Sequence, residues 1–80
     1  MSDWTEKVTA AEAGAERKQA AEHEAEQRFR AVQAQAEAHG DADAALLSDE
    51  FHAWMATRHE TDAAWGVWSM AMDAKAAAQG

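Results

Sequence analysis

The sequence predicts an all-α protein, an antiparallel two-helix hairpin, and we expect the hairpin to dimerise into a four-helix bundle. Three observations lead to this fold class. The chain is rich in alanine and has no proline, which is a helix-forming composition. Apolar residues recur at alternating spacings of four and three in both halves. Gly40 lies between the two halves, where a chain reversal would bring their apolar stripes together.

The length of 80 residues predicts a single domain over residues 1–80, whose small core gives it only marginal stability alone. Chains of this size are usually reinforced by disulfides, a metal or oligomerisation. The chain contains no cysteine, so disulfides are excluded. We therefore expect a homo-oligomer, most simply a dimer, or binding to a protein partner whose identity the sequence does not give.

The first helix is predicted over about residues 4–38. Asp3 and Glu6 have the spacing of a capping box at its start. Its end is predicted at His39 and Gly40, because glycine readily takes the left-handed conformation that terminates helices. The 4-3 stripe between these signals reads Trp4, Val8, Ala11, Ala15, Lys18, Glu22, Ala25, Phe29, Val32 and Ala36.

The connector is predicted over residues 39–48, with a short helical turn capped by Asp41 and with Leu46 and Leu47 plugging the end of the hairpin. Ser48 is a good N-cap for a second helix over about 49–77. Gly66 costs this helix about 1 kcal/mol relative to alanine. Alternatively, Thr57 and Glu60 could cap the start of a separate helix after a kink, but we expect one continuous helix.

The 4-3 stripe of the second helix is rich in rings, so the hairpin should pack large side chains over small ones. The stripe reads Leu47, Phe51, Trp54, Arg58, Thr61, Trp65, Trp68 and Met72, and Met55 widens it. For a turn at residues 40–47, the numbers of facing residues should total about 83. Phe29 then faces Trp54, and Ala15 faces Trp68.

A polar layer interrupts both stripes at the same level, formed by Lys18, Glu22, Arg58 and Thr61. We expect a Glu22–Arg58 ion pair with Thr61 hydrogen-bonded to it, because such groups are costly to bury alone. A layer of this kind more often sets register than adds stability. The alternative interpretation is a ligand site around Glu22 and Arg58.

The large apolar side chains are predicted to form both the core and a contact surface, because a single seam cannot surround a tryptophan. A second hairpin or a partner helix would cover the remaining flanks. The candidate interface residues are Phe29, Phe51, Trp54, Met55, Trp65, Trp68 and Met72. Val67 and Met70 lie outside the stripe and mark a smaller second patch.

The net charge of −8, from 7 basic and 15 acidic side chains, disfavours direct binding to nucleic acid. It favours a basic protein partner or, in a sharper alternative, a surface that imitates DNA and inhibits a nucleic-acid-binding protein. The sequence shows no signal peptide and no apolar stretch near the ~20 residues that span a bilayer. We expect a soluble, cytoplasmic protein with no membrane contact.

No motif predicts catalysis or a cofactor. The sequence has no nucleophile–base set and no glycine-rich phosphate loop. His52 and His59 share a helical face and His23 lies at a similar level, so a metal-binding bundle is a further alternative. The Asp49–His52 spacing resembles that of di-iron bundles but occurs once where such sites need two copies. We predict no enzyme.

Two families are similar in overall plan. The length, the hairpin and the Trp65-Gly66 pair resemble the small secreted WXG-type helical hairpins, which place a Trp-x-Gly tripeptide in the turn rather than inside a helix. The plan also resembles the small dimeric hairpins that regulate plasmid RNA, although this chain is acidic. Both resemblances imply a fold and carry no residue roles. The leading functional hypothesis is a non-enzymatic interaction protein.

Overall fold

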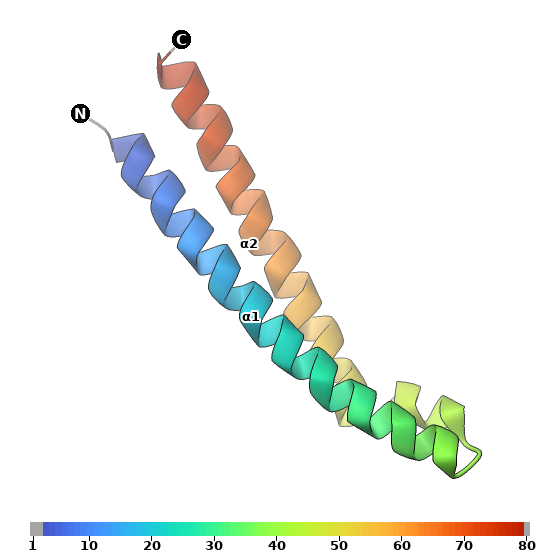
Figure 1. Cartoon of the computed structure of the whole chain (residues 1–80). Helices are drawn as coiled ribbons and strands as arrows, with labels where there is room; N and C mark the ends of the chain where they lie inside the picture. The colour runs from blue at the N-terminus through green and yellow to red at the C-terminus, as the bar shows by residue number, and fades with distance from the viewer. Residues whose placement is uncertain (1–2, 80) are drawn as a thin grey trace.

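The computed structural model describes residues 3–79 as two long helices and a short one. Helix α1 covers Asp3–Ala38, the 3-10 helix η1 covers Ala42–Leu47 and α2 covers Asp49–Gln79. The long helices run antiparallel, with the start of α1 and the end of α2 together at one end and η1 at the other (Figure 1). The described chain measures 59 × 15 × 14 Å. The predicted all-α hairpin is confirmed.

The turn after α1 is a Schellman motif centred on Gly40. Gly40 has φ 75°, in the left-handed region. Its N–H donates to Glu37 O at 3.0 Å, and the N–H of Asp41 donates to Ala36 O at 2.9 Å. These two bonds satisfy carbonyls that the end of a helix otherwise leaves free. The prediction that α1 ends at this glycine is confirmed.

The connector differs from the prediction in two respects. The Asp41 side chain makes no capping hydrogen bond, and its carbonyl accepts the Ala44 N–H at 3.1 Å instead. Leu46 and Leu47 are 52% and 80% exposed, so they do not plug the hairpin. A 3-10 helix has three residues per turn, so consecutive side chains point in different directions. Ala45, at 1% exposure, is the one that faces the long helices.

The start of α2 is capped as predicted. The Ser48 hydroxyl accepts the Phe51 N–H at 3.1 Å and donates to Ala45 O at 2.6 Å. This single side chain therefore caps α2 and fastens η1 to it. At the other long helix, Asp3 is already part of the first turn of α1 rather than a cap before it, and its negative charge suits that position.

Helix α2 continues without interruption through Gly66. The alternative fresh start at Thr57 is wrong, because the Thr57 hydroxyl donates back to Trp54 O at 2.7 Å within the helix. A single rigid helix therefore fixes the spacing of all side chains between residues 49 and 79 relative to α1.

The seam between the helices follows the prediction on α1 and shifts on α2. Val8, Ala15, Ala25 and Phe29 are buried, as the 4-3 stripe of α1 requires. On α2 the buried or half-buried positions are 50, 51, 54, 55, 57, 61, 64, 65, 68, 71, 74 and 75. Among them, positions 50, 54, 57, 61, 64, 68, 71 and 75 keep the 4-3 spacing, and we take these as the seam. Ala71 is buried while the predicted Met72 is 40% exposed. Small side chains of α2 therefore also lie in the seam, and this places the neighbouring large ones on its flank.

Candidate interaction surface

Three aromatic rings close the hairpin near its turn. Phe29, only 2% exposed, stacks on Trp54 with centroids 5.1 Å apart and ring planes at 26°. Phe51 packs against Phe29 at 5.3 Å and against Trp54 at 6.5 Å. The predicted pairing of Phe29 with Trp54 is confirmed. Phe29 and Trp54 serve as core within one chain, and Phe51 covers them from the edge of the seam. The role of these rings in contacting another chain stays a prediction.

Two arginines lie over the Trp54 ring. The Arg30 guanidinium is 5.2 Å from the ring centroid and that of Arg58 is 5.9 Å away. Arg30 also contacts Glu26 at 3.4 Å and donates to Gln33 at 2.9 Å. Cation–π contacts of this kind stabilise by about 0.5–1 kcal/mol at exposed sites. Arg58 makes no ion pair within the described hairpin, so its charge is free for another contact.

The predicted polar layer is assembled differently. No Glu22–Arg58 ion pair forms among residues 3–79, and Lys18 instead contacts Glu60 at 3.5 Å with both side chains about half exposed. Thr61 is buried at 6% exposure, and its hydroxyl donates to Thr57 O at 2.9 Å in the same helix. The difference arises because Arg58 lies one residue outside the seam. An exposed ion pair such as Lys18–Glu60 adds little stability.

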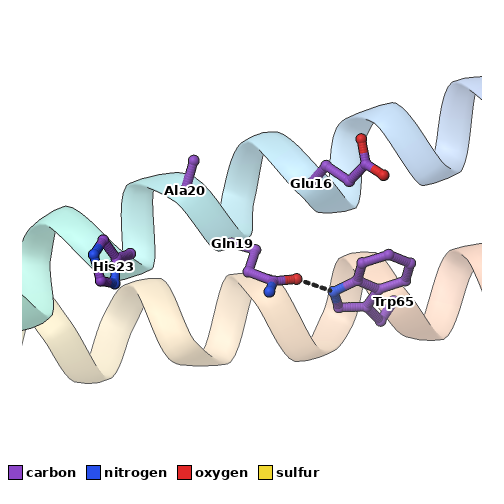
Figure 2. A pocket seen from close by; sticks show the side chains of 5 residues that line it. All are labelled: Glu16, Gln19, Ala20, His23 and Trp65. Atoms are coloured by element: carbon purple, nitrogen blue, oxygen red, sulfur yellow. Dashed lines mark hydrogen bonds between the residues drawn. The ribbon is translucent and has the colours of Figure 1, made fainter.

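Trp65 lies beside the seam and forms one wall of a shallow groove of about 530 Å³. Its indole N–H donates across the seam to Gln19 Oε1 at 3.2 Å. Figure 2 shows Gln19 reaching from α1 to the ring on α2, with Glu16 and His23 on the neighbouring turns of α1. The groove is open to solvent and partly aromatic, so it offers a contact surface rather than an enclosed site.

A second groove of about 470 Å³ lies at the open end of the hairpin. Its lining consists of Trp4, Lys7, Ala11, Val67, Met70, Ala71 and Ala74. Val67 and Met70, predicted as a minor patch, are 53% and 65% exposed. The Lys7 ammonium lies 4.4 Å from the Trp4 ring centroid. Sequence reasoning missed this Trp4–Lys7 contact, although the i, i+3 spacing is a usable signal for it.

The two tryptophans on the seam, Trp54 and Trp68, lack hydrogen-bond partners for their indole N–H groups within the described part of the chain. Both indole nitrogens are buried. A buried donor without a partner costs about 1–3 kcal/mol. Packing these rings between only two helices therefore lowers the stability of the hairpin by part of what burial of the rings contributes.

No match to this chain was found among protein-family models, curated proteins or solved structures. Over residues 3–79 no group of three histidine, aspartate or glutamate side chains is arranged to hold a metal ion, so His23, His52 and His59 are not brought together. Within the same residues, no helix has the length and apolarity that crossing a membrane requires.

The candidate interface residues divide into two groups. Phe29, Trp54 and Trp68 lie on the seam and serve the core. The others, Phe51, Met55, Trp65 and Met72, each follow a seam position of α2 by one residue, as do Arg58 and Asp62, which were not among the predicted interface residues. We call these six residues the lateral face. One residue corresponds to about 100° around a helix, so the lateral face lies beside the seam rather than in it.

Proposed function

We propose that this hairpin is a non-enzymatic interaction protein that docks onto another protein chain through the lateral face of α2. The observation that carries the proposal is the one-residue offset between the seam and these side chains. Within one chain Trp65 and Phe51 are half-buried, as Trp54 and Trp68 on the seam also are, and Met72 is 40% exposed. Removing such rings and thioethers from water is favourable, by about 25 cal/mol per Å² of apolar surface.

The position of the lateral face suits a helical bundle. In a bundle of four helices each helix packs against two neighbours, in directions about 90° apart. Helix α2 uses its seam for α1, and the lateral face lies about 100° around the helix from that seam. A further helix can therefore pack there without disturbing the α1–α2 contact. Aromatic and thioether side chains are also those that most often dominate protein interfaces.

The Trp65 groove extends this surface onto α1. Gln19, Glu16 and His23 supply polar groups along its edge. An apolar centre with a polar rim is the usual composition of a docking interface. Chemistry is a poorer explanation, because general acid–base catalysis benefits from a site that excludes water, and this groove is open.

Matched methionine substitutions test the proposal. Met72→Asp places a charge on the lateral face, and Met70→Asp places the same charge on an exposed methionine outside it. We expect Met72→Asp to weaken association at least about tenfold, because burying an unpaired carboxylate is costly, and Met70→Asp to leave it unchanged. Sedimentation measures self-association, and affinity capture from the cells that produce the protein measures binding to other chains.

The two variants should also keep the thermal stability of the isolated hairpin, since both methionines are exposed. If wild type neither self-associates nor retains any protein that Met72→Asp loses, the lateral face is not a docking surface. If only Met70→Asp loses binding, the groove at the open end, which Met70 lines, is the docking surface instead.

The alternative of an acidic inhibitor rests on the charge distribution. The turn end carries Glu37, Asp41, Asp43, Asp49 and Glu50, and no lysine or arginine interrupts residues 37–50. Such a surface would occupy a basic, nucleic-acid-binding site. Binding of this kind weakens steeply as salt rises and competes with DNA, whereas docking through the apolar lateral face depends little on salt. A salt titration of the captured complex separates the two.

A further inference from the structure

The centre of the lateral face carries one positive and one negative side chain. Arg58 and Asp62 lie four residues apart on α2, both exposed, and neither forms an ion pair within the described hairpin. Met55 lies three residues before Arg58, and Trp65 lies three residues after Asp62. The spacings three, four and three read the same in both directions along the helix. The order apolar, charged, charged, apolar is therefore also preserved when the helix is reversed.

We infer that α2 binds α2 of a second copy in antiparallel orientation through the lateral face, with Arg58 of each copy facing Asp62 of the other. The inference rests on the proposed function and names the partner and the register of that surface. Facing residue numbers total 120 in this register, so Met55 of each copy lies against Trp65 of the other. Methionine sulfur packs favourably on aromatic rings.

Charge complementarity selects this arrangement over its neighbours. A parallel pairing would place Arg58 against Arg58 and Asp62 against Asp62 of the second copy, and like charges that face each other are destabilising. Sliding one helix of the antiparallel pair by four residues, about one turn, would put the two Asp62 side chains together and separate the arginines from them. Only the register centred between Arg58 and Asp62 pairs both charges and both apolar groups at once.

The same arrangement offsets part of the electrostatic repulsion between two negatively charged copies. Two copies bring together a net charge of −8 each, which opposes association over the Debye length of about 8–10 Å. The two Arg58–Asp62 contacts place opposite charges at the closest point of approach. The two-fold symmetry uses the same patch on both subunits, as is usual for homodimers.

Charge reversal followed by mixing tests the inference. Arg58→Asp and Asp62→Arg should each weaken self-association at least about tenfold, because each variant alone brings like charges together across the interface. Mixed in equal amounts, the two variants should form a heterodimer with twice the chain mass of 8.7 kDa, measured by light scattering or native mass spectrometry. The double variant carrying both reversals should recover self-association.

The controls are Arg28→Asp and Glu24→Arg, which make the same charge changes on exposed positions of α1. We expect both controls to dimerise as wild type does. Circular dichroism checks that every variant keeps its helices. A loss of the Arg58–Trp54 contact alone lowers stability in Arg58→Asp but gives no heterodimer on mixing, so recovery on mixing is specific to the pairing across copies.

Two results would overturn the inference. One is a wild-type chain that keeps a mass of 8.7 kDa at every concentration, which would leave docking to a different protein as the function of the lateral face. The other is a wild-type dimer whose two single reversals do not combine on mixing. In that case sensitivity to Met72→Asp would still support docking through this face, and only its antiparallel register would be wrong.

Discussion

The two ends of the hairpin are packed unequally. Near the turn, three rings interlock, and Phe29 is 2% exposed. At the open end, Trp4 is 36% exposed and Val67 is 53% exposed, and most of the surrounding seam is alanine. Large interlocking side chains remove more apolar area from water than alanines do. The comparison indicates that the turn end holds the fold together, while the open end and the flank of α2 keep apolar surface exposed.

Shortening Phe29 tests this comparison with the largest effect. Phe29→Ala should lower the free energy of unfolding by about 3–5 kcal/mol, because it leaves a cavity between Phe51 and Trp54. Val67→Ala, at the open end, should lower it by less than about 0.5 kcal/mol. Urea unfolding followed by circular dichroism measures both. Equal losses would show that the two ends contribute alike and would remove the basis of the comparison.

The turn itself provides the second test. Gly40→Ala should lower the free energy of unfolding by about 1–2 kcal/mol, because an L side chain is strained at φ 75°. A Cβ at this position meets no atom within 4 Å, so the cost lies in the backbone alone. Gly40→Asn should lose less, since asparagine tolerates this conformation better. Identical unfolding curves for wild type and Gly40→Ala would show that the Schellman turn is not needed.

The fold was predictable from the sequence because its signals are local. Gly40 and Ser48 each act on backbone groups within a few residues, and those bonds form as expected. The 4-3 stripe of α1 also identified Phe29 as core. The connector leucines were misplaced because apolarity alone does not show which residue of a 3-10 turn faces inward.

The surface was less predictable, because it depends on where the α2 stripe meets α1. Periodicity defines a stripe about 100° wide, and two neighbouring residues can both lie within it. Ala71 and Met72 are such a pair, and the smaller side chain, Ala71, is the one that packs in the seam. With the same offset, Arg58 forms no ion pair with Glu22 among the described residues and lies over the Trp54 ring instead. Side-chain volume across the seam, which a single stripe does not reveal, decides these positions.

The smallest expected effect concerns the second half of α2, where Gly66 interrupts an otherwise helix-forming segment. Gly66→Ala should raise the free energy of unfolding by about 1 kcal/mol, because alanine loses less backbone entropy in a helix. An added Cβ meets nothing within 4 Å, so no contact opposes the gain. The gain should appear as a higher urea midpoint with an unchanged slope.

Gly66 lies outside the lateral face, so Gly66→Ala should also leave the dissociation constant of the proposed dimer unchanged. Sedimentation of the same protein preparation measures this. If stability rises while association weakens, a second chain approaches the backbone at Gly66, and the glycine serves close contact between helices. The interface would then extend beyond the Trp65 flank toward the exposed side of α2, and the open end of the hairpin would share in docking.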